Sequence, residues 1–93
     1  MLFMVIERFK NGDPGPIGER FERLGRMLPE QVAYHASWVE PSGGRCFQIM
    51  EAPSAGHLAP WIERWNDLVD FEIISVVNSA EFWSALTSTE RKS

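Results

Sequence analysis

The order of strand-like and helix-like patterns is the feature of this chain that most limits its fold. Apolar, β-branched runs typical of strands occur four times, at residues 2–9, 32–40, 45–52 and 71–77. Two stripes of apolar residues at helical spacing lie between them, at residues 16–28 and 54–68. This β-α-β-β-α-β order predicts an α+β, ferredoxin-like antiparallel sheet with two helices on one face. A capping-box pattern starts a short further helix that ends near Leu86.

A chain of 93 residues is expected to form one domain, here over residues 1–86, followed by a loose polar tail at 87–93. The net charge of −4 without a basic stripe argues against nucleic-acid binding. The single cysteine, Cys46, cannot form an internal disulfide, and the apolar start is too short to cross a membrane. We therefore expect a cytoplasmic protein without membrane contact.

The turn at residues 41–44 fixes which side chains of the flanking strands lie opposite each other. A loop of two or four residues places Trp38 opposite Phe47, on the side that we expect beneath the helices, with Leu2, Met4 and Ile6 of the first strand. The opposite, mixed side carries the pairs Val39–Cys46, Ser37–Gln48 and His35–Met50, with Phe3, Val5, Glu7 and Phe9. Such large apolar residues gain about 1.5–3 kcal/mol each on burial, so this open face needs a cover. The simplest cover is a second copy of the chain, placed sheet against sheet. We therefore predict a homodimer with a partly polar cavity between the two sheets.

The chain to about Leu86 resembles a family of short bacterial proteins known only as a domain of unknown function. The stretches that carry the likeness are MLFMVIERFKNGDPGPIGERFERLGRMLPE, YHASWVEPSGGRCFQIMEA and APWIERWNDLVDFEIISVVNSAEFW. That family is placed among the dimeric α/β-barrel proteins, so the resemblance implies the same homodimer. It implies no substrate, cofactor or catalytic residue, and kinship at the level of the fold says little about function.

Polar residues on the mixed face are the candidates for a site. His35 is the expected acid/base, because its unperturbed pKa of about 6.5 suits proton transfer, and Glu7 would orient it or take a proton. The ligand-binding candidates are Ser37, Gln48, Cys46, Met50 and Trp38. The alternative interpretation is a polar network that satisfies itself across the dimer interface.

Other residues point to simpler roles. His35 and His57 lack the spacing of metal ligands, so neither a metal nor a haem is expected. Cys46 is expected to be a small buried residue and not a nucleophile. Trp61 and Trp65 share a helical face and are expected to pack against Trp38 and Phe47, or to line the mouth of a pocket.

The sequence therefore favours a small dimeric protein that binds an apolar or aromatic molecule, between sheet and helices or in the dimer cavity. Two alternatives stay open. One is a cofactor-independent monooxygenase or isomerase that uses His35, and the other is a purely structural dimerisation module.

Overall fold

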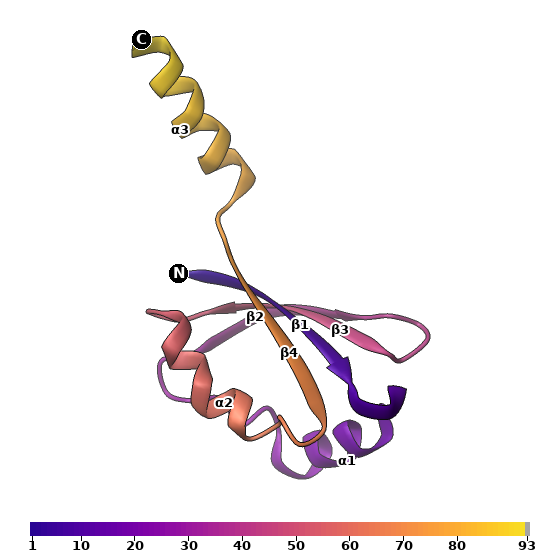
Figure 1. Cartoon of the computed structure of the whole chain (residues 1–93). Coiled ribbons are helices and arrows are strands. Elements are labelled where there is room, and N and C mark those ends of the chain that lie inside the picture. Colours follow the sequence, from indigo (N-terminus) through magenta and orange to yellow (C-terminus); the bar gives the residue numbers. More distant parts are fainter. Residues whose placement is uncertain (93) are drawn as a thin grey trace.

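The computed structural model describes residues 1–92, with side chains up to residue 87. It is an α+β fold in which four antiparallel strands form a single sheet, in the order β2-β3-β1-β4. The helices α1 and α2 lie on one face of the sheet, whereas α3 projects away on the other side (Figure 1). The strands are β1 (Leu2–Phe9), β2 (Ala33–Val39), β3 (Arg45–Glu51) and β4 (Val69–Val76), and the helices are α1 (Gly15–Leu24), α2 (Ala59–Glu63) and α3 (Ser79–Lys92), with short 3-10 turns η1 (Lys10–Gly12) and η2 (Ala55–Leu58).

Two of the helices are shorter than predicted and one is longer. Gly25 ends α1 four residues before Pro29, because it takes φ +69° and its N–H donates to the Phe21 carbonyl at 2.7 Å. The predicted second helix consists of η2 and the five-residue α2, with Pro60 in the first turn, where proline is tolerated. Helix α3 runs on to Lys92, through residues that were expected to form a loose tail, and Ser93 lies outside the described residues. None of the described helices combines the length and the apolar character that a membrane crossing needs.

The predicted assignment of the two sheet faces is wrong, because the mixed face is the one beneath the helices. Phe3 and Val5 are fully buried there, in a core that they share with Trp61 and Trp65. The reason is electrostatic: the other face carries five charged side chains, which would be costly to bury. These are Arg8, Arg45, Glu51, Asp70 and Glu72, which lie on the same side of the strands as Met4, Ile6 and Ile74.

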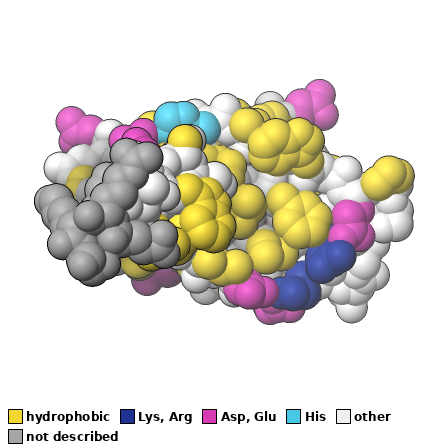
Figure 2. Space-filling view, turned by 90° about the horizontal axis from the view of Figure 1, so that it is seen from above, with side chains coloured by type: hydrophobic (Ala, Val, Ile, Leu, Met, Phe, Trp, Pro, Cys, Tyr) yellow, Lys and Arg dark blue, Asp and Glu magenta, His cyan; other side chains and the backbone are white. Residues whose placement is uncertain are grey.

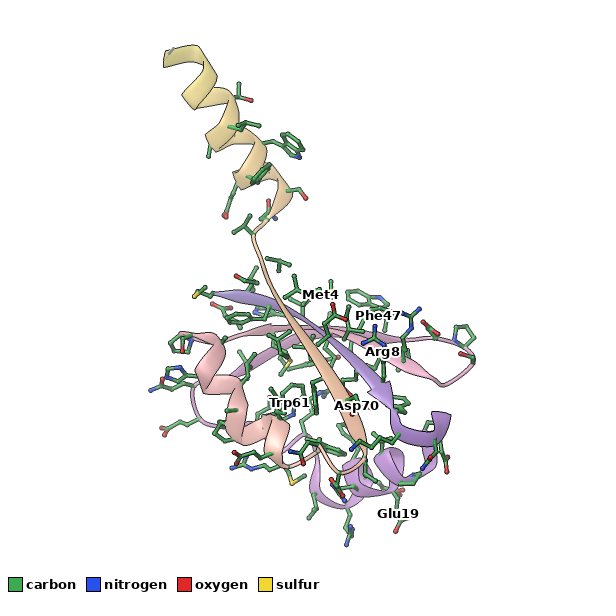
Figure 3. The ribbon with its side chains drawn as sticks, viewed as in Figure 1. Met4, Arg8, Glu19, Phe47, Trp61 and Asp70 are labelled. Carbon is green, nitrogen blue, oxygen red and sulfur yellow. The ribbon has the colours of Figure 1, made fainter. Side chains whose placement is uncertain are left out.

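The other face, which we call the open face, is apolar at its centre and charged at its ends. Figure 2 shows hydrophobic side chains gathered across the middle of this face. Figure 3 shows Met4 and Phe47 on this side of the sheet and Trp61 on the helix side. Two of its side chains are well exposed, Trp38 at 60% and Ile74 at 39%. The apolar centre of the open face consists of Met4, Ile6, Trp38, Phe47, Ile49 and Ile74.

The hairpin of β2 and β3 has the predicted register near its turn. Trp38 lies opposite Phe47, Ala36 opposite Ile49, Ser37 opposite Gln48, and Val39 opposite Cys46. Farther from the turn the register shifts, so that Tyr34 and not His35 is the partner of Met50. The irregularity at His35 is a β-bulge, which adds a residue to one strand and re-aims the side chains beyond it.

Candidate functional site

A cavity of about 240 Å³ lies between the sheet and the helices. Strands β1, β2 and β3 form its floor, and α1, α2 and the segments that follow each helix form its other walls. Most of the lining is apolar, as is usual for a site that holds a small organic molecule. The lining residues are Glu7, Phe9, Ile17, Gly18, Phe21, Arg26, Ser37, Val39, Cys46, Gln48, Trp61 and Trp65.

Glu7 is the one acidic side chain in this cavity, and its environment alters its chemistry. It lies on the helix side of β1 and is 6% exposed. Burial raises the pKa of the Glu7 carboxyl from 4.5 to about 7, although the positive charge of Arg26 acts in the opposite direction. Near neutral pH the carboxyl can therefore either donate or accept a proton.

Two polar atoms of the lining are buried without a hydrogen-bond partner among the described residues. They are Gln48 Oε1, an acceptor on β3, and Trp61 Nε1, a donor on α2. Leaving such an atom unpaired costs about 1–3 kcal/mol, so most buried polar groups in folded proteins are paired. Because both atoms belong to residues that line one cavity, a bound molecule with a donor and an acceptor could satisfy both.

The remaining polar groups of the lining are less suited to chemistry. Burial, and then the charge of Glu7, raises the pKa of the Cys46 thiol to about 11, so it is a poor nucleophile at neutral pH. The Ser37 hydroxyl already shares a 2.7 Å hydrogen bond with the Tyr34 hydroxyl. These two side chains contribute shape and polarity to the cavity.

The structure brings together four of the seven residues that the sequence suggested for the site: Glu7, Ser37, Cys46 and Gln48. Met50 is fully buried in the adjacent core and does not line the cavity. Trp38 lies on the open face.

The predicted pairing of His35 with Glu7 is wrong. His35 is exposed, and its Nε2 donates to Glu51 Oε1 at 2.7 Å. Glu51 lies opposite Leu2, on the open side of the sheet, whereas Glu7 faces the helices. The β-bulge accounts for the difference, because it turns His35 away from the side that Ser37 occupies.

The tryptophans of α2 and the segment after it line the cavity, as one of the two interpretations predicted. The expectation that they pack against Trp38 and Phe47 is wrong, since those residues lie on the other face. Trp61 instead meets Phe71 edge-on, with ring centroids 5.2 Å apart. Trp65 Nε1 donates to the Arg26 carbonyl at 3.0 Å.

Arg26 also lines the cavity, and the sequence pattern did not reveal this position. The helical stripe predicted at residues 16–28 would have included it in the first helix, but α1 ends before it. The chain turns at Gly25, and the Arg26 guanidinium then lies 3.5 Å from the centroid of the Tyr34 ring, at the wall of the cavity. Gly25 could have indicated this end of the helix in the sequence, since a glycine after a helical stripe often ends a helix.

A bidentate ion pair holds α1 against the segment that follows α2. The Arg20 guanidinium donates to Asp67 Oδ1 at 2.8 Å and to Asp67 Oδ2 at 2.7 Å, and also to the Arg64 carbonyl at 3.0 Å. Because both segments contribute to the cavity wall, this contact fixes its width. Among residues 1–92, no three histidine, cysteine or acidic side chains come together as a metal site would require.

Comparison with known proteins gives one result. Residues 1–90 match the family described as a domain of unknown function, DUF3303. Neither a curated protein nor a solved structure matches the chain.

Proposed function

Because the chain belongs to the DUF3303 family, whose description assigns no activity, we propose a function from the site itself: it binds a small, mainly apolar molecule between sheet and helices. The observation that carries this proposal is the pair of unpartnered atoms, Gln48 Oε1 and Trp61 Nε1, in residues that line an apolar cavity. An aromatic body would lie among Phe9, Phe21 and Trp65. A polar group at one end of the molecule would bond to the two unpartnered atoms.

The volume of the cavity sets the size of the ligand. Engineered apolar cavities of about 150 Å³ hold benzene, so about 240 Å³ suits a molecule of one or two rings. This is below the range of about 300–1,000 Å³ that is usual for drug-sized ligands. The proposed ligand is therefore a single- or double-ring compound with one hydroxyl or similar group.

Binding of 2-naphthol, which has an apolar body and one hydroxyl, tests this proposal by fluorescence and by NMR. A side chain at Gly18 would enter open space at the cavity wall, since nothing lies within 4 Å of an added Cβ there. We expect Gly18→Leu to weaken binding at least tenfold while the far-UV circular dichroism stays unchanged. Arg23→Leu is the matched control, because it adds the same side chain on the exposed side of α1 that faces away from the cavity. Equal binding by both variants would refute the site, and native mass spectrometry would identify any natural ligand that co-purifies.

A second candidate function is proton transfer catalysed by Glu7 without a cofactor. The pKa of about 7 favours it, because a general base works best when its pKa is near the working pH. His35 is unsuited to this role, since it is exposed and bonded to Glu51. If a co-purified compound exchanges a carbon-bound hydrogen in D2O, the exchange should vanish in Glu7→Gln while binding persists. Binding without hydrogen exchange would refute catalysis by Glu7 and would support ligand binding as the only function of the cavity.

We also propose that a second copy of the chain covers the open face. This proposal assigns the protein to the ferredoxin-like, dimeric α/β-barrel class that the resemblance implied. It is supported by the apolar centre of the open face and by the ion pairs Arg8–Glu72 and Lys10–Asp70, where β1 ends and β4 begins. An interface with an apolar core and a polar rim is typical of protein assemblies.

Sedimentation equilibrium tests the homodimer. We expect the wild type to sediment as a dimer and Ile74→Glu as a monomer, because a carboxylate would be buried at the interface. Ile74→Val is the matched control and should remain dimeric. A monomeric wild type would refute the dimer. A purely structural module would form the same dimer but bind no 2-naphthol.

A further inference from the structure

Helix α3 does not pack on the domain from which it comes. No other element within residues 1–92 makes more than marginal contact with it. Figure 1 shows α3 rising from the end of β4 on the side of the open face, opposite α1 and α2. The radius of gyration is 16.0 Å, compared with about 12 Å for a compact domain of this length. Within the part of the chain that the structure describes, the helix is therefore an arm that projects from the domain without packing against another element.

The arm also carries large aromatic side chains that are exposed to solvent, which is unusual for a helix that stays in solvent. Phe82 is 50% exposed and Trp83 is 60% exposed, and the two rings meet edge-on with centroids 5.1 Å apart. Leu86 lies one turn further along, beside Phe82 and Trp83, and is also exposed. Ser84 lies on the opposite side of the helix, at 100° per residue. The arm thus has one apolar side, which is exposed among the side chains that the structure describes, residues 1–87.

We infer that α3 crosses to a second copy of this chain and packs its Phe82–Trp83–Leu86 side against the flank of that copy. The inference rests on the proposed dimer, in which the two open faces meet. Because β4 is an edge strand, the arm leaves at the border of the sheet and does not block the open face. It stands where the edge of the facing copy would lie.

The length of the arm matches this arrangement. Two sheets that pack face to face lie about 10 Å apart. Fourteen helical residues span about 21 Å, so the arm reaches beyond the sheet of the second copy to the level of its helices. A helix of fewer than about seven residues would end between the two sheets.

The area that a dimer must bury also supports a contribution from the arm. Four strands of seven or eight residues present only on the order of 500 Å² per copy, whereas a stable interface buries about 800 Å² per partner. Each copy would contribute its own arm and contact the arm of the other copy. A helix face of this length buries on the order of 200 Å² in each of these two contacts, in addition to the area of the sheet. Sheet and arms together reach the size that a stable dimer needs, and the sheet alone does not.

Sedimentation equilibrium of full-length variants tests the arm. We expect Trp83→Glu to weaken dimerisation at least tenfold, and Ser84→Glu, which adds the same charge on the opposite side of α3, to leave it unchanged. Circular dichroism should show equal helix content in both. If Trp83→Glu dimerises like the wild type while Ile74→Glu does not, the arm inference is overturned and the dimer through the open face stands. If the wild type is monomeric, the dimer itself fails and the inference fails with it.

A second measurement places the arm directly. In a dimer of one isotope-labelled and one unlabelled copy, filtered NMR detects contacts only between copies. We expect cross-peaks from the rings of Phe82 and Trp83 to the other copy. Cross-peaks from open-face residues such as Ile49, without any from the arm, would show that α3 stays in solvent.

Discussion

Glu7 and Cys46 lie directly opposite each other on β1 and β3, beneath the helices. Each is buried, and the charge of Glu7 is one cause of the raised pKa of the Cys46 thiol. An ionised Glu7 is thus unfavourable for the fold, and the stability of the protein should depend on its protonation.

We predict that the free energy of unfolding falls as the pH rises from about 4.5 to about 7. The folded state holds the Glu7 proton up to a pKa of about 7, whereas the unfolded chain releases it near 4.5, so the folded state binds more protons in this window. The stabilisation is complete below pH 4.5 and is lost as the pH passes 7. A shift of this size corresponds to on the order of 3 kcal/mol. Urea unfolding between pH 4 and 8 measures it.

Glu7→Gln is the matched variant, because it keeps the size of the side chain and removes the titration. Its stability should stay nearly level between pH 5 and 8, and it should exceed that of the wild type at pH 8. A wild-type profile that rises over this window would contradict the assignment.

We predict that the Cys46 thiol reacts slowly in the folded protein. Its pKa of about 11 leaves almost no thiolate at neutral pH, and the side chain is buried. Iodoacetamide should therefore modify it at least a hundredfold more slowly in buffer than in 6 M guanidinium chloride, as followed by mass spectrometry. Comparable rates in the two solutions would show that the cavity opens freely.

Gln48→Met should separate binding from stability. The variant removes an acceptor that has no partner among the described residues and keeps a similar volume, so the free energy of unfolding should rise by about 1–3 kcal/mol. The same change removes a proposed ligand contact, and 2-naphthol should bind more weakly. Ser37→Ala changes another polar group of the lining that is already bonded to Tyr34, and it should lower stability instead. A loss of stability in Gln48→Met would mean that Oε1 is paired in solution.

The element order and the register near the turn could be predicted because they follow from local patterns. Runs of apolar and β-branched residues located the strands, and the symmetry of the turn placed Trp38 opposite Phe47. The choice between the two sheet faces could not be made from hydrophobicity alone, since both are apolar. The charged residues Arg8, Arg45 and Glu72 would have decided it, because their parity is that of Ile6.

The site was predicted only in part, and the reason is a single bulge. Residues between the turn and the bulge, such as Ser37 and Gln48, are in the expected pairs. Beyond it the parity changes, so His35 faces outward and Tyr34 faces the core. A bulge adds one residue without a distinctive sequence mark, whereas the end of α1 at Gly25, which places Arg26 in the cavity wall, did have one.

The ion pair between Arg20 and Asp67 should hold the cavity together. The guanidinium beside Asp67 lowers the pKa of that carboxyl in the folded state. Its stabilisation of the fold is therefore complete above the ordinary pKa of 3.8 and is lost as the pH falls through the lowered value. We predict that Asp67→Asn lowers the melting temperature by a few degrees at pH 7. The effect should be smaller in 1 M salt, because Asp67 is exposed and Arg20 is only partly buried, so that salt screens the pair. Asp70→Asn, which removes an exposed charge paired with Lys10 at 3.9 Å, is the control and should change it less. Thermal unfolding followed by circular dichroism distinguishes the two, and equal melting temperatures would show that α1 is held by apolar packing alone.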